Sequence, residues 1–171
     1  EKHPDAQFAI IANGPYQQPF WDIQSFHGIA KRLAVHNFDG RLSQLGFAAS
    51  DFTLMPSLFE PCGLPQMQAP IYGSLAIAHN TGGLHDTVEP LNVAAHTGNG
   101  FVFDTYDANG LFWAMDQAMA FWAEPRETRE AEITRIMSES LTRFNHEACA
   151  RQYIELYERM LNRHLVKDFA Q

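Results

Sequence analysis

Short apolar runs alternate with segments of helical spacing over the first two thirds of this chain, and that alternation most narrows the fold it can adopt. Proline, glycine or polar residues close each apolar run, as expected of buried strands. The runs that predict strands are 8–12, 34–38, 52–55, 75–78 and 100–103. Helices are predicted between them, at about 19–33, at 41–49 and after Gly63. Strands alternating with helices over short connections predict an α/β fold, with a parallel sheet and helices on both faces.

From Asp107 onward the sequence predicts helices almost without a break. They cover 107–123, 126–143 and 146–164. The last of them has an apolar stripe of Ala150, Tyr153, Ile154, Tyr157, Met160 and Leu161. The first has aromatic residues that are expected in the core, namely Phe112, Trp113, Phe121 and Trp122. We expect 1–171 to form a single partial domain, with an α/β core over about 1–123 and C-terminal helices over about 124–171.

The composition is that of a folded, acidic protein. Of the 171 residues, 46% are hydrophobic, and the net charge is -8. Such a chain has little long-range attraction for nucleic acid or anionic membranes, and it lacks a run of about twenty apolar residues that would predict a membrane span. Cys62 and Cys149 lie far apart and in no paired-cysteine motif. We therefore expect no nucleic-acid or membrane partner, no bound metal, and a reduced, cytoplasmic setting.

Ligands of parallel α/β sheets bind outside the carboxyl ends of the strands. The loop after 52–55 places Glu60 at such an end, just before a predicted helix. Glu60 either caps that helix or faces a ligand pocket, and the residues alone favour neither. Cys62 has the chemistry of a nucleophile, but no histidine can be placed beside it from sequence, so packing or ligand contact is favoured.

A second loop at a strand end, after 75–78, contains the pair Gly82-Gly83. Backbone amides of such a pair can bind a phosphate, although a tight turn would use the same residues. The spacing matches neither a Walker nor a dinucleotide-binding motif. Both interpretations of this loop stay open on the residues alone.

Taken together, the two loops resemble one family. The string LMPSLFEPCGL at 54–64, followed by TGGL at 81–84 and DTV at 86–88, is similar to the retaining, ADP-glucose-using glycogen and starch synthases. The resemblance is strong over 51–88 and touches most of the chain more loosely. It implies the GT-B architecture, in which two Rossmann-like domains face each other across the active site. This chain would be most of the second domain.

The resemblance also implies roles for the matching residues. Glu60 would be the catalytic residue near the donor glucose, and Phe38 would stack on the nucleobase. The residues that would contact the donor sugar and diphosphate are Cys62, Gly63, Leu64, Thr81, Gly82, Gly83 and Leu84. The implied reaction moves glucose from ADP-glucose, or UDP-glucose, to the non-reducing end of an α-1,4-glucan with retention and without a cofactor. The alternative is a nucleotide- or sugar-binding module of another GT-B glycosyltransferase, inactive on its own.

The sequence departs from the family pattern at several points. Pro65 stands where the family commonly has Thr or Ser, and Pro70 would kink the following helix. Nearby glycosyltransferases carry a second glutamate at the position of Gln68, so this residue favours the glycogen synthase pattern. The basic segment that neutralises the departing diphosphate and the first domain of the family are not found in these residues. We therefore expect an N-terminal partner domain on the same protein, and no transferase activity from the 171 residues alone.

Overall fold

The computed structural model describes residues 2–165, which divide into two compact units, one ending at Ser50 and the other beginning at Asp51. The first unit contains, in order, β1 (Phe8–Ile11), α1 (Gln17–His27), β2 (Leu33–His36) and α2 (Gly40–Ala49). Its two strands pair in parallel, with Phe8 opposite Leu33 and Ile11 opposite His36. The unit is thus a small strand–helix–strand–helix repeat, as the apolar pattern predicts.

Local signals set the ends of both helices in the first unit. The Asp39 carboxylate accepts a hydrogen bond from the Leu42 amide at 2.7 Å and caps α2. The prediction that the preceding helix extends to about residue 33 is wrong. Helix α1 ends at His27, because Gly28 adopts a left-handed φ of 62° and its N–H bonds to the carbonyls of the last turn.

The second unit is built on a three-stranded parallel sheet in the order β3 (Phe52–Met55), β4 (Leu75–His79) and β5 (Gly100–Phe103). Phe52 lies opposite Leu75, and Ala76 lies opposite Gly100. The crossovers contain α3 (Pro65–Gln68), the 3₁₀ helix η1 (Ala69–Tyr72) and α4 (Gly82–Thr87). Three longer helices follow: α5 (Ala108–Trp122), α6 (Arg126–Arg143) and α7 (His146–Leu161).

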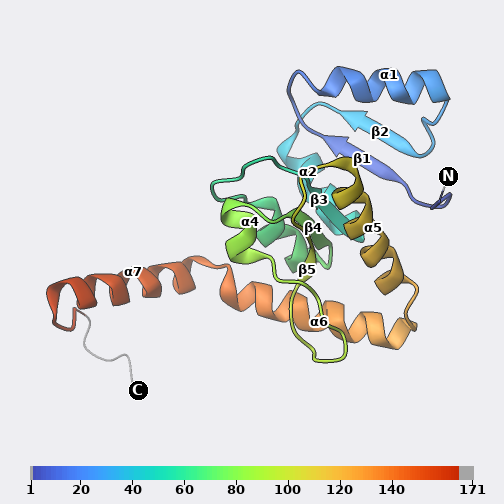
Figure 1. Ribbon diagram of the computed structural model, residues 1–171. Helices are drawn as coiled ribbons and strands as arrows, with labels where there is room; N and C mark the ends of the chain where they lie inside the picture. The colour runs from blue at the N-terminus through green and yellow to red at the C-terminus, as the bar shows by residue number, and fades with distance from the viewer. Residues whose placement is uncertain (1, 166–171) are drawn as a thin grey trace. The chain divides into compact units, whose positions relative to one another are not determined.

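Alternate residues of β4, the central strand of this sheet (Figure 1), face two different cores. Leu75 and Ile77 belong to a cluster that takes in buried residues of β5, α5 and α6. Ala76 and Ala78 pack instead with Leu84 and Val88, from α4 and its end. Because side chains along a strand alternate between faces, α5 and α6 cover one face of the sheet and α4 covers the other. The predicted α/β fold, with helices on both faces, is confirmed.

The strands form two sheets rather than one. Among residues 2–165, β1 and β2 pair with each other, and β3 pairs only with β4. All four residues of β3 are only half-buried, although three of them, Phe52, Leu54 and Met55, are apolar. The expectation of one domain over 1–171 stays a prediction. None of the helices in the described part of the chain is both long and apolar enough to cross a membrane.

The aromatic residues of α5 do not all lie in the core. Ala114, Ala118 and Phe121 are the buried residues of this helix, at spacings of four and three. That stripe turns Phe112 and Trp113 outward, where they are 45% and 56% exposed, so their predicted core positions are wrong. Helix α7 has no buried residue, and the apolar stripe predicted on it is exposed except at Ile154, which is half-buried.

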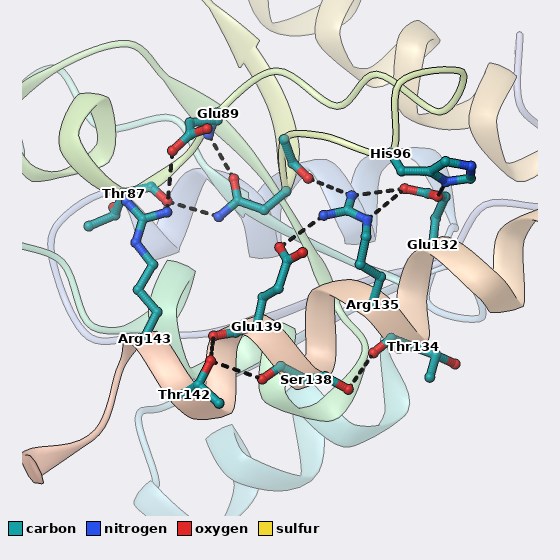
Figure 2. Close-up of polar contacts among 12 residues, drawn as sticks. Thr87, Glu89, His96, Glu132, Thr134, Arg135, Ser138, Glu139, Thr142 and Arg143 are labelled. Atoms are coloured by element: carbon teal, nitrogen blue, oxygen red, sulfur yellow. Dashed lines mark hydrogen bonds and ion pairs between the residues drawn. The ribbon is translucent and has the colours of Figure 1, made fainter. Parts of the chain in front are cut away.

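A polar network holds the segment before β5 against α6 (Figure 2). The Glu132 side chain is 1% exposed and bonds both to His96 Nδ1 and to the Arg135 guanidinium. Arg135 also donates to the Gly98 carbonyl at 2.8 Å. Farther along α6, Arg143 pairs with Glu89 at 3.3 Å. The segment from 89 to 99, which contains little regular structure, is therefore fixed by side chains of a helix about forty residues away in sequence.

Candidate functional site

Two loops interlock at the carboxyl ends of β3 and β4. The Gly83 amide donates to the Glu60 carbonyl at 2.7 Å. A Cβ added to Gly82 would collide with the Glu60 carbonyl oxygen, and one added to Gly83 would collide with the Cys62 backbone. Both glycines are therefore required by the close approach of two backbones. The structure thus brings Glu60, Cys62, Gly82 and Gly83 of the predicted site together, and it uses the Gly83 amide inside the chain.

Glu60 does not cap the helix that follows it. Helix α3 begins at Pro65, and its N-cap residue is Leu64, which makes no side-chain capping bond. The Glu60 side chain is half-buried, and its carboxylate has no hydrogen-bond or ion-pair partner among residues 2–165. Of the two interpretations that the sequence left open, this geometry favours a carboxylate available to a ligand.

The side chain of Gln66 holds the Glu60 loop by hydrogen bonds to its backbone. The Gln66 side chain is fully buried, and its amide nitrogen lies 2.8 Å from the Cys62 carbonyl and 3.0 Å from that of Gly63. The same nitrogen lies 3.2 Å from Thr87 Oγ1, at the end of the second loop. Sequence reasoning gave Gln66 no role, because a glutamine in a short helix gives no local sign of buried tertiary partners.

Replacing Gln66 with leucine is expected to lower the free energy of unfolding by about 1–3 kcal/mol, because buried carbonyls lose their donor. The Gln66 Oε1 atom is itself buried without a partner among the described residues, so removing it offsets part of the loss. Chemical denaturation measures the change. Gln68→Leu, at an exposed position two residues on, is the matched control. Equal stabilities of the two variants would contradict the role assigned to Gln66.

Cys62 is exposed, and its sulfur lies 3.7 Å from the Gly63 carbonyl. No hydrogen bond joins the thiol to a histidine in the part of the chain that the structure describes. The thiol therefore lacks the base that a cysteine nucleophile requires. This observation favours the packing or ligand-contact interpretation of Cys62.

The remaining predicted site residues occupy different surroundings. Leu84 is 1% exposed, its side chain belongs to the core, and its amide donates to the Thr81 carbonyl at 3.0 Å. Thr81 is the N-cap residue of α4, without a side-chain capping bond. Leu64 is 58% exposed. Phe38 belongs to the other unit, where it is 59% exposed and its amide bonds to the Asn13 side chain at 3.0 Å.

The end of β4 adds polar side chains for which the sequence suggested no role. His79 is 8% exposed, and its Nδ1 lies 2.8 Å from the Ser57 carbonyl. The next residue, Asn80, bonds to Asp104 at 2.6 Å and to His85 at 2.7 Å. These contacts join the strand end both to the Glu60 loop and to the segment after β5.

Known proteins match this chain closely. A family model described as glycosyl transferases group 1 matches residues 1–135. The glycogen synthase of Streptococcus sanguinis (strain SK36) is 40% identical over 161 residues, which make up 92% of this chain and 33% of that protein. The glycogen synthase of Clostridioides difficile (strain 630) is 38% identical over 154 residues, covering 90% and 31%. The chain thus spans about a third of the length of these curated relatives.

A solved structure supports the same relationship. The catalytic domain of starch synthase IV from Arabidopsis thaliana, bound to ADP and acarbose, matches with a TM-score of 0.78 at 34% identity. The match covers 92% of this chain and 33% of that chain. The fold and the loops at the strand ends define this chain as a C-terminal-type domain of the GT-B class. It belongs to the group 1 glycosyl transferases, and the predicted resemblance to glycogen and starch synthases is confirmed.

Proposed function

We propose that this chain is the donor-binding part of a glycogen or starch synthase. The complete protein would transfer glucose from ADP-glucose to the non-reducing end of an α-1,4-glucan with retention. The observation that carries the proposal is the interlocked pair of loops, which holds an unpaired, half-buried Glu60 carboxylate at the carboxyl end of the sheet. The starch synthase that shares this fold at 34% identity was solved with ADP and acarbose.

The geometry suggests a division of labour during transfer. Departure of the diphosphate leaves positive character on the sugar and negative charge on the leaving group. The Glu60 carboxylate is suited to the sugar side, where it would stabilise the positive character or hold the hydroxyl groups. The Gly83 amide is occupied by the Glu60 carbonyl, so it supports the loop instead of donating to a phosphate. Cations for the leaving diphosphate would come from a basic segment at the start of this C-terminal-type domain, and the glucan acceptor would bind in the cleft that this domain forms with the N-terminal domain.

Calorimetry with ADP, ADP-glucose and UDP-glucose tests the proposal on the chain itself. We expect ADP-glucose to bind, and Glu60→Gln to weaken it about tenfold or more while leaving ADP affinity nearly unchanged, because only the sugar contacts the carboxylate. Glu124→Gln, at an exposed position at the end of α5, is the matched control. If none of the three ligands binds to the unaltered chain, the proposal is refuted.

The alternative is a nucleotide- or sugar-binding module that takes no part in catalysis. It is favoured only by the length of the match, which covers a third of the relatives. An assay of glucan extension distinguishes the synthase from the non-catalytic module. The complete polypeptide should extend a maltooligosaccharide primer from ADP-glucose, and the 171-residue chain should not. An inactive complete polypeptide that still binds ADP-glucose would favour the module.

A further inference from the structure

His79 is a buried polar residue that the proposed transfer does not yet use. It is the last residue of β4 and 8% exposed. Its Nδ1 lies 2.8 Å from the carbonyl oxygen of Ser57, in the Glu60 loop. A carbonyl oxygen can only accept a hydrogen bond, so Nδ1 must carry a proton and donate. The contact therefore shows that the Nδ1 nitrogen of His79 carries a proton and donates it to the Ser57 carbonyl.

Packing fixes the direction in which this imidazole points. The ring centroid lies 5.3 Å from that of Phe103 and 5.0 Å from that of Tyr106. Phe103 ends β5 and is 3% exposed, so it forms a rigid wall. Phe103 and Tyr106 also line a cavity of about 240 Å³ beside Pro56. A ring held in this way places its donor at a fixed point and leaves the Ser57 carbonyl little freedom.

The two donors that hold the Glu60 loop at its front come from one short segment. His79 bonds to the Ser57 carbonyl, and Gly83 bonds to the Glu60 carbonyl. The donors are four residues apart and the acceptors three apart, so the loop is clamped on both sides of Leu58 and Phe59. These two residues are 67% and 69% exposed, so their side chains contribute little burial to hold the loop. The position of the Glu60 carboxylate thus depends on these hydrogen bonds as well as on the close packing of the Gly82-Gly83 backbone.

We propose that His79 is a positioning residue for the donor sugar, because it locks the Ser57 end of the loop and so sets where the Glu60 carboxylate stands. The proposal rests on the function proposed above. It follows that a substitution at His79 should change the binding and turnover of the donor sugar more than it changes the binding of the nucleotide. A misplacement of about 1 Å at a reacting group can lower the rate about a hundredfold.

Two variants separate the hydrogen bond from the packing. His79→Phe keeps an aromatic ring against Phe103 and Tyr106 but has no donor. His79→Asn loses the ring but places an amide nitrogen on Cγ, as Nδ1 is placed in histidine. His27→Asn, at an exposed position in α1, controls for the substitution itself. Thermal melts of all three identify any variant that fails to fold.

Amide hydrogen exchange on the 171-residue chain tests the lock without any ligand. We expect His79→Phe to speed exchange at least tenfold at the Gly83 amide, which donates to the Glu60 carbonyl, and His79→Asn to restore most of the protection. ADP-glucose affinity in this chain, and kcat in the complete polypeptide, should fall about 10- to 100-fold in the phenylalanine variant, with ADP affinity changing less. The asparagine variant should recover most of this loss.

Unchanged exchange in His79→Phe, or identical behaviour of the two variants, would overturn the proposal. Equal losses of ADP and ADP-glucose affinity would also overturn it, because a merely structural residue would weaken both. The failure of the proposed function looks different. In that case the unaltered chain binds no nucleotide sugar, while the exchange pattern still decides whether His79 holds the loop.

Discussion

Substituting alanine for Gly83 is expected to abolish measurable ADP-glucose binding and to lower the free energy of unfolding by about 2–4 kcal/mol. The new Cβ would meet the carbonyl oxygen, carbonyl carbon and Cα of Cys62, all of them backbone atoms. Backbone cannot rotate out of the way as a side chain can, so the two loops must separate. Separation also breaks the bond from the Gly83 amide to the Glu60 carbonyl.

Gly40→Ala is the matched control for this prediction. Gly40 is the first residue of α2, its φ is not in the left-handed region, and a Cβ there meets nothing within 4 Å. Alanine in a helix is favoured over glycine, so this variant should be as stable as the unaltered chain or slightly more stable. Denaturant titration measures stability, and calorimetry measures binding. If Gly83→Ala bound ADP-glucose normally, the interlocked loops could not be the donor site.

Much of the secondary structure could be predicted because its signals are local. The strands 52–55 and 100–103 and the helix 126–143 have the predicted bounds, since prolines, glycines and polar turns flank them. The helix predicted to run to about 33 failed for a reason of the same kind. A glycine inside an apolar periodic run is compatible with a helix interior or a helix end, and only the backbone angle of Gly28 decides between them.

The candidate site could be predicted only as two separate loops. Each loop follows a strand, so the rule for parallel sheets identified both. That the Gly82-Gly83 backbone packs on Glu60–Cys62 is a tertiary fact, and no spacing within either loop encodes it. The same holds for the bond from His79 to the Ser57 carbonyl, which joins residues 22 positions apart.

The network around Glu132 could not be predicted from sequence patterns. Its partner His96 is 36 positions away, in a segment without helical or strand periodicity. A glutamate in the middle of a charged helix is normally solvated, so nothing in the local sequence indicates that this one is buried. Burial of Glu132 is possible because Arg135 and His96 provide the hydrogen bonds that water would otherwise give.

Glu132→Ala is accordingly expected to cause a large loss of stability, about 3–5 kcal/mol at neutral pH. The change leaves Arg135, whose side chain is 19% exposed, without its buried partner, and it frees His96. His96 has a φ of 54°, an unfavourable angle for a residue other than glycine. Without the bond to Glu132, we expect the segment that contains His96 to relax to a different backbone conformation. Denaturant unfolding measures the loss, with Glu130→Ala, an exposed member of the same helix, as control.

The pH dependence of stability provides a second test of the same network. Burial by itself would raise the pKa of Glu132, but hydrogen bonds and charge from His96 and Arg135 outweigh it and hold the pKa below its ordinary value. A carboxyl group with a lowered folded-state pKa stabilises the protein above its unfolded pKa of about 4.3, and that stabilisation is lost as the pH falls through the folded value. Stability of the unaltered chain should therefore fall on acidification below about pH 5, and the Glu132→Ala variant should show a shallower fall. Parallel pH profiles for the two proteins would mean that Glu132 is not held ionised by this network, and the stability loss at neutral pH would then have to come from packing alone.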